Sequence, residues 1–550
     1  MKRGSIFNSA FKSILLLIVF SISIAAQTTI VKGKLLDVNG KPSKYALVGT
    51  ISSIQNANGK DFVSCDANEN YSITLKKPGV NFLLFSIPSH NPLKVPVLND
   101  RNKKLTIDVT LAPYKYKNNF DDVGVAGSFN DFALSSPEKM TKQEDGTYTY
   151  EVKTDQKEIS YQLCNIEINS RTINAPGSES FEPDSSGDYR SIMTVNNGAA
   201  KIVFDPSKLL IKDAESKVSV KGNSYDKKIS EIYNEYTKVL DDASKKFQEY
   251  RDAKKSPMNF KYDRGTYFSD LLSRINKEKN ERIKDLLKLL YVSFAYYHPV
   301  DYSFEKATAF YESIPPARQA WEVLPNSFNS YFNLIPQYKW NDLQDKFLKE
   351  TKSNSVKFTI LFGKLATAKF SGNVTELKKI HELVKKDFAD AQEAQDLLKR
   401  FPVESKIKVG AEIPDFTVTS LDNKDEQFSK HSMLGKIYMI DFWATWCGPC
   451  VAEMDGLQKA YDKFKSKGFE ILSLSMDKST DDVAKFRKEK YPMPWMNAFL
   501  VNDWKNKIVK EFEVIGIPRP ILVDANGKIL AMEGDLRGGN LEKTLSKYFK

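Results

Sequence analysis

Two cysteines near the C-terminus have the spacing of a redox-active dithiol. Cys447 and Cys450 are separated by Gly448 and Pro449, and they follow a nearly continuous apolar run over residues 437–443. Such a run is typical of a buried central strand. The apolar residues after the pair mark one face of a helix: Met454, Leu457, Tyr461 and Phe464. We therefore expect Cys447 to lie at the N-terminus of a helix that follows a strand.

A helix N-terminus favours dithiol chemistry because its free N–H groups and partial positive charge stabilise a thiolate. The pKa of a cysteine, about 8.5 in isolation, can fall to about 7 or below in such a position. The thiolate of Cys447 could then attack a substrate disulfide, and Cys450 could resolve the mixed disulfide. Half a zinc site is the alternative, but the chain has only four cysteines and four scattered histidines. The sequence predicts no metal site and no cofactor.

The segment 408–550 resembles thioredoxin, and more closely the exported thiol–disulfide oxidoreductases of the ResA/TlpA-like group. The matching residues are the run 441–450, Glu453 and the run 516–518. The resemblance implies an α/β thioredoxin-like fold and a cis bond between Ile517 and Pro518 that lies against the sulfurs. It assigns Asp441 as a buried carboxylate beneath the dithiol.

Asp441 or Glu453 could take the proton from Cys450 during resolution, since a desolvated carboxylate has a raised pKa. The alternative for Glu453 is an exposed acid in the first turn of the helix, which would complement the helix dipole. The residues expected to contact substrate are Trp446, Gly448, Pro449, Ile517 and Pro518.

Two positions depart from the family pattern. Asp455 stands where thioredoxins carry a kinking proline, which predicts a straighter active-site helix. Arg519 follows Pro518 where a small polar residue is usual, and we expect a cation beside the site that favours thiolate or acidic partners.

A peroxiredoxin-like peroxidase is an alternative function, because these enzymes share the fold and the entrance of the type seen at Pro414, Asp415 and Phe416. Peroxiredoxins need a Pro-x-x-x-Thr/Ser-x-x-Cys setting, and the residues before Cys447 lack that proline and its spacing. Thiol–disulfide exchange is therefore the main hypothesis.

The first 26 residues have the layout of a signal peptide. Lys2 and Arg3 precede a short apolar run over 14–24, and small residues at Ala25 and Ala26 offer a cleavage point near Ala26. The run is shorter than the about 20 residues of a membrane-spanning helix, so an uncleaved anchor is the less favoured alternative. We expect export to the periplasm or elsewhere outside the cytoplasm, and no membrane span in the mature chain.

Hydrophobic periodicity divides the rest of the 550-residue chain. Alternating strands predict a β-sandwich over 27–112, similar to the carboxypeptidase-regulatory-like domains, and a second one over 113–215, similar to early-set immunoglobulin-like domains. Apolar stripes at three- and four-residue steps predict an all-helical domain over 216–403, and the thioredoxin-like domain covers 404–550. The expected helices lie near 225–247, 268–297, 302–314, 340–350, 356–370 and 374–400.

Partners follow from these features. The net charge of +11 comes from lysines spread along the chain, so we expect no nucleic-acid binding. The expected partners are exported proteins with disulfides and an unidentified electron donor, and the helical domain could mediate self-association. A scaffold that binds a surface partner or a glycan, with an accessory thioredoxin unit, is an alternative from another class. Cys65 and Cys164 are expected to be lone thiols.

Overall fold

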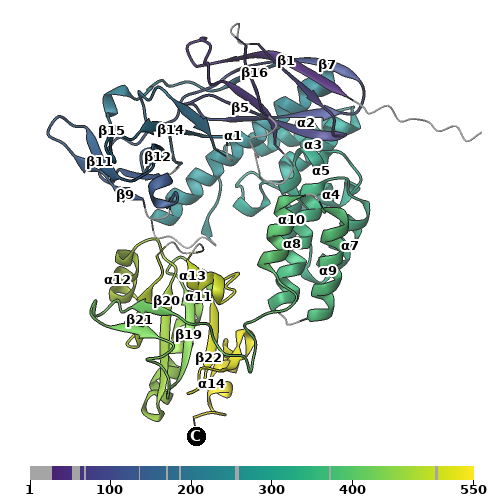
Figure 1. Cartoon of the computed structure of the whole chain (residues 1–550). Coiled ribbons are helices and arrows are strands. Elements are labelled where there is room, and N and C mark those ends of the chain that lie inside the picture. Colours follow the sequence, from purple (N-terminus) through teal and green to yellow (C-terminus); the bar gives the residue numbers. More distant parts are fainter. Residues whose placement is uncertain are drawn as a thin grey trace, which may run out of the picture.

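The computed structural model describes residues 28–549, apart from 52–61, 67–69, 135–136, 169–170, 185–186, 254–258, 371–372, 390, 502–503 and 505. The predicted signal peptide lies outside these residues. Figure 1 shows two β units and a helical unit in the upper part of the view, and an α/β unit that holds the C-terminus below them. In the described part of the chain, no helix combines the length and apolar character that crossing a bilayer requires.

The first β unit consists of two four-stranded sheets around one core. The sheet orders are β16-β7-β1-β4 and β3-β2-β5-β6, and Val31, Val48 and Phe85 are among the residues of their shared core. The strands are β1 (Thr29–Leu36), β2 (Leu47–Ile51), β3 (Phe62–Ser64), β4 (Asn70–Leu75), β5 (Gly79–Ser86), β6 (Leu93–Asn99), β7 (Lys103–Thr110) and β16 (Lys217–Lys221).

Strand β16 corrects the predicted boundary at residue 216, which placed 217–221 with the helical domain. This strand pairs antiparallel with β7, with Lys217 opposite Thr110. Val218 and Val220 alternate toward the core of the first β unit and pack against it. The first β unit is therefore completed by residues that follow the second β unit in the sequence.

The second β unit also has two sheets, ordered β13-β14-β12-β8-β9 and β10-β11-β15. Its core includes Val125, Ile159 and Phe204. The strands are β8 (Gly124–Gly127), β9 (Glu138–Lys139), β10 (Thr141–Lys142), β11 (Tyr148–Lys153), β12 (Glu158–Cys164), β13 (Phe181–Pro183), β14 (Tyr189–Thr194) and β15 (Ala199–Phe204).

The helical unit follows β16, and its first helix packs on the first β unit. Tyr233 of this helix lies 5.3 Å from Phe82 of β5 between ring centroids, and Asp226 pairs with Lys103 at 2.7 Å. The helices are α1 (Ser224–Asp252), α2 (Tyr267–Lys277), α3 (Glu281–Val292), α4 (Phe304–Ser313), α5 (Ala320–Val323), α6 (Tyr331–Leu334), α7 (Trp340–Glu350), α8 (Asn354–Phe370), α9 (Val374–Asp387) and α10 (Gln392–Arg400).

Two of the expected helices are each divided in two. The stretch 268–297 breaks between α2 and α3, where Asn280 accepts hydrogen bonds from the N–H groups of Arg282 and Ile283 and caps α3. The stretch 374–400 breaks between α9 and α10, after Asp387. Apolar residues continue across the second break through Phe388, Ala391 and Ala394, whereas the first break lies in the polar run 276–282, whose seven residues periodicity did not separate from the flanking stripes.

The C-terminal unit is a thioredoxin-like domain built on a five-stranded sheet in the order β21-β20-β19-β22-β23. Strand β19 lies at its centre, parallel to β20 and antiparallel to β22. The elements are β17 (Thr417–Thr419), β18 (Gln427–Ser429), β19 (Ile437–Trp443), α11 (Gly448–Phe464), β20 (Phe469–Ser475), α12 (Thr480–Glu489), β21 (Met496–Phe499), α13 (Lys507–Glu511), β22 (Arg519–Val523), β23 (Ile529–Met532) and α14 (Gly539–Leu545).

Both faces of β19 are buried, as the apolar run predicted. Met439 and Trp443 belong to a cluster with residues of α11, α12 and α14. Tyr438, Ile440 and Phe442 point to the other face, where α13 and the β17–β18 hairpin cover the sheet. The central strand is thus packed on both faces, and the turn that follows it, which leads to Cys447, starts from a buried strand.

Candidate active site

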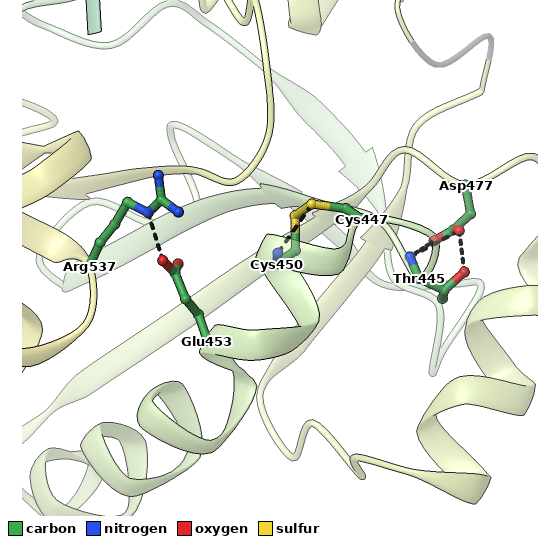
Figure 2. The surroundings of a disulfide bond; sticks show 6 residues. All are labelled: Thr445, Cys447, Cys450, Glu453, Asp477 and Arg537. Carbon is green, nitrogen blue, oxygen red and sulfur yellow. Dashed lines mark hydrogen bonds and ion pairs between the residues drawn. A yellow bond between two sulfur atoms is a disulfide. The ribbon is translucent and has the colours of Figure 1, made fainter. Parts of the chain in front are cut away.

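Cys447 is the N-cap residue of α11, as the strand–helix pattern predicted. Its Sγ accepts a hydrogen bond from the N–H of Cys450 at 3.2 Å. The two cysteines form a disulfide with their Cα atoms 5.2 Å apart, and Figure 2 shows the bond at the start of the helix. In the reduced protein, the same N–H and the helix dipole would stabilise a thiolate on Cys447.

The two cysteine residues differ little in exposure in the disulfide form. Cys447 is 5% exposed and Cys450 is 2% exposed, whereas the neighbouring Trp446 is 50% exposed. Cys450 is the more buried of the pair, as expected, but by a small margin. Trp446 therefore presents an apolar surface to solvent directly beside the more accessible cysteine.

An open pocket of about 360 Å³ adjoins the dithiol turn. Pro449 lines one part of it, and Ile517 and Pro518, joined by a cis peptide bond, line another. Three of the expected substrate contacts are thus brought together from α11 and the loop before β22. The remaining lining residues are Gly516, Glu533, Gly534 and Arg537. Gly448 and Trp446 do not line the pocket.

Asp441 is a buried carboxylate on the same face of β19 as Met439 and Trp443, the face that carries the dithiol helix. Burial and, to a smaller extent, the nearby Glu453 carboxylate raise the pKa of Asp441 to about 7, against the opposing effect of Arg537. A group with this pKa exchanges protons readily at neutral pH. Asp441 is buried, as the resemblance implied.

Glu453 forms an ion pair with Arg537, whose Nε donates to Oε1 at 2.6 Å (Figure 2). Its side chain is 23% exposed. No acidic residue lies in the first turn of α11, so the alternative of a first-turn acid that complements the helix dipole is wrong. Glu453 lies in the second turn, where it contributes to the electrostatic environment of Asp441.

The C-terminal unit matches known families. Residues 409–532 match the AhpC/TSA family. The thiol-disulfide oxidoreductase ResA of Bacillus thuringiensis subsp. konkukian is 33% identical over 150 residues, which is 27% of this chain and 82% of the relative. ResA of Geobacillus kaustophilus is 30% identical over 129 residues, 24% of this chain and 71% of the relative. The solved thioredoxin domain of a thiol-disulfide oxidoreductase from Bacteroides vulgatus is 33% identical, covers 26% of this chain and 99% of its own, and has a TM-score of 0.24.

The chain belongs to the ResA family of thiol-disulfide oxidoreductases. The match to the ResA proteins covers about a quarter of the chain, so it characterises the C-terminal unit. The β units and the helical unit of this ResA-family protein lie outside the matched region.

Arg519, which was expected to be a cation beside the ResA-type site, is buried and paired with a carboxylate. It is 3% exposed and forms an ion pair with Glu533. Burial lowers the pKa of Arg519 to about 10, with Glu513 opposing the shift, so the guanidinium stays charged at neutral pH. Glu533 therefore offsets the positive charge that was expected to favour a thiolate or acidic partners.

One carboxylate that contacts the turn before Cys447 was not predicted from the sequence. Asp477, which is buried, accepts hydrogen bonds from the Thr445 N–H at 3.1 Å and from its hydroxyl at 2.6 Å (Figure 2). The Ser475 hydroxyl also donates to Asp477 at 2.8 Å. Since β19 and β20 are parallel, residues just after their carboxyl ends meet at one edge of the sheet. That rule could have identified Asp477 as a partner of the turn before Cys447.

Arg537 was also missed, and no local pattern could have found it because it lies 84 residues from its partner Glu453. The two remaining cysteines, Cys65 and Cys164, are not bridged to each other, and burial raises the pKa of Cys164 to about 12. Among the described residues, no group of three or more His, Cys, Asp or Glu side chains is arranged to hold a metal ion.

Proposed function

We propose that this oxidoreductase is exported and reduces disulfides in other exported proteins through Cys447 and Cys450. The observation that carries the proposal is the position of Cys447 at the N-cap of α11, beside an exposed Trp446 and a pocket lined by Pro449 and Pro518. This arrangement gives one sulfur a stabilised anionic form and gives a polypeptide an apolar surface to lie on.

The first step is attack by the Cys447 thiolate on one sulfur of a substrate disulfide. A mixed disulfide forms between Cys447 and that sulfur, the substrate S–S bond breaks, and the second substrate sulfur leaves as a thiolate. Trp446, Pro449, Ile517 and Pro518 would hold the substrate backbone beside the attacked bond.

The second step is resolution by Cys450. Its thiol loses a proton and attacks Sγ of Cys447, which forms the enzyme disulfide and releases the first substrate sulfur as a thiolate. Asp441 would accept the proton, because its pKa of about 7 lies close to the working pH. Glu453 and Arg537 would set that pKa through their opposite charges. The substrate gains two electrons, and an external dithiol or other two-electron donor must return them to the enzyme.

The direction of electron flow is inferred from the Gly448 and Pro449 pair between the cysteines. It resembles that of reducing thioredoxins, whose potentials lie near about −270 mV. Export rests on the layout of the first 26 residues. Measurement of the Cys447/Cys450 potential against glutathione buffers tests the direction, and a value near that of an oxidant such as about −120 mV would reverse it.

Insulin reduction by the full chain, with dithiothreitol as donor, tests the activity. Cys447→Ser should lose at least a hundredfold in rate, and Cys450→Ser should stop after one mixed disulfide on Cys447. Cys65→Ser and Cys164→Ser are matched controls and should retain the parent rate. A parent chain that consumes hydrogen peroxide but not insulin would favour the peroxidase alternative. No turnover of either, with glycan binding by the full chain, would favour the scaffold.

A further inference from the structure

The loop that leads into the cis-proline leaves the C-terminal unit and packs against the helical unit. Ile515, 9% exposed, belongs to a buried apolar cluster whose other fully buried members lie within residues 361–401. Leu365 of α8, Ile380 of α9 and Phe401 after α10 are among them. An apolar side chain next to the substrate pocket is therefore held by helices that lie outside the ResA-matched region.

Polar contacts fix the same loop from the helical side. Nη2 of Arg400 donates to the Ile515 carbonyl at 2.9 Å. The guanidinium of Arg400 itself lies over the rings of Phe362 and Phe401, at 5.5 and 5.8 Å. Two aromatic side chains of the helical unit therefore orient the guanidinium of Arg400 toward the loop.

Glu513 is the second attachment point. Its Oε2 lies 3.8 Å from Nζ of Lys369 in the last turn of α8, and the two side chains are 15% and 11% exposed. Its carboxylate also accepts hydrogen bonds from the Ser405 hydroxyl and, at 3.1 Å, from the Lys406 N–H. Glu513 has φ of 48°, a left-handed conformation that a non-glycine residue keeps only where its surroundings determine it.

The anchored segment continues directly into the substrate pocket. Gly516, Ile517 and Pro518 follow Ile515 and line the pocket opposite Pro449. Arg519 then begins β22, beside the central strand β19. Gly516 of the pocket wall directly follows Ile515 and lies three residues after Glu513, so a displacement of either residue is passed to the wall over a short stretch of backbone.

We propose that Lys369 and Arg400 are positioning residues for the dithiol site: the helical unit holds the cis-proline loop in the conformation that receives a substrate polypeptide. The inference rests on the exchange activity proposed above, and it gives the helical unit a role in substrate capture. Small displacements of a positioning group lower rates by large factors, about a hundredfold for about 1 Å.

The test uses the full chain and two matched pairs of variants. Lys369→Met removes the cation that faces Glu513, and Lys364→Met is its control on the same helix, where Lys364 pairs with Asp345 at 2.9 Å inside the helical unit. Arg400→Ala removes the donor to Ile515, and its control is Arg318→Ala, which breaks the pair with Asp285 at 3.4 Å inside that unit. Lys369→Met and Arg400→Ala should lower kcat/KM for insulin reduction three- to tenfold, and each control should change it less than twofold.

A second readout separates positioning from general damage. The alkylation rate of reduced Cys447 by iodoacetamide, followed by mass spectrometry of its peptide, should stay within twofold in all variants, since this small reagent does not need the loop. Hydrogen exchange of the 513–518 segment should quicken at least threefold in Lys369→Met and Arg400→Ala only. Unchanged kcat/KM in both variants, or a proportional fall in alkylation, would overturn the inference.

The outcome also distinguishes the two proposals. If the parent chain fails to reduce insulin but its disulfide form oxidises a peptide dithiol, the reductase proposal fails, and the same variant pairs are compared in that oxidation. A parent chain that exchanges disulfides in neither direction overturns both.

Discussion

Arg537 donates to Glu453 at 2.6 Å, and the two charges act with opposite sign on the pKa of the buried Asp441. The pair couples the second turn of α11 to the segment before α14. Removing the charge of Glu453 should therefore lower the pKa of Asp441, and removing the charge of Arg537 should raise it.

Asp441→Asn should slow the resolution step. Without a carboxylate to accept the Cys450 proton, the mixed disulfide on Cys447 should accumulate, with a fall in turnover of about 10²-fold, typical of a lost general base. In the parent, resolution should quicken as pH rises through about 7, because Asp441 becomes the carboxylate. Acid quenching and mass spectrometry measure the mixed disulfide. A variant with the parent's pH profile would exclude Asp441 as the proton acceptor.

Asp441→Asn should also change stability with pH. The Asp carboxyl has an ordinary pKa of 3.8, and in the folded protein the pKa of Asp441 is about 7, so the folded state binds this proton more tightly than the unfolded chain does. The stability from this group is complete below about pH 4 and is lost as pH rises through 7. Each unit of pKa corresponds to about 1.4 kcal/mol, which gives a loss of up to about 4 kcal/mol above pH 7. The variant should therefore gain in melting temperature more at pH 8 than at pH 5, as calorimetry of the two proteins would show.

Glu453→Gln and Arg537→Gln should shift the pH profile of resolution in opposite directions. Glu453 raises the pKa of Asp441 and Arg537 lowers it, so the midpoint should fall in the first variant and rise in the second. The double variant should lie between them. Stopped-flow resolution rates from pH 5 to 9 measure the midpoints. Shifts of the same sign would show that the variants act through folding rather than through charge.

Asp477→Asn should loosen the turn before Cys447, because the amide cannot accept all the hydrogen bonds that Thr445 and Ser475 donate to the carboxylate. A buried donor left without an acceptor costs about 1–3 kcal/mol. We expect a lower melting temperature and a three- to tenfold fall in insulin reduction. Thr445→Ser retains the hydroxyl and is the matched control; equal losses in both variants would contradict this role for Asp477.

Local sequence determined the centre of the site because its chemistry is local. The apolar run over 437–443 and the Cys447 N-cap are as the residues predicted, and the cis Ile517–Pro518 bond is as the family resemblance implied. The capping residue Asn280, followed by Glu281, could have shown that 268–297 is two helices. The immunoglobulin-like and carboxypeptidase-regulatory-like resemblances stay predictions.

Contacts between distant segments could not be predicted in the same way. Arg537 pairs with Glu453, and Arg400 reaches Ile515 across 115 positions. The pairing of Arg519 with Glu533 was not predicted, because Glu533 lies directly after β23, beyond the β22–β23 hairpin. In these three cases the partner is a residue that only tertiary packing brings near.

Strands β7 and β16 are antiparallel neighbours in the first sheet, with Thr110 opposite Lys217, so the second β unit is inserted into the connection between them. Its two ends leave the first sheet side by side. A short turn could therefore replace the second β unit without changing the pairing of β7 with β16. The chain would still pass from β16 through the helical unit to the dithiol. The second β unit is thus an insertion within the first, whereas the helical unit is the segment that joins the first β unit to the C-terminal unit.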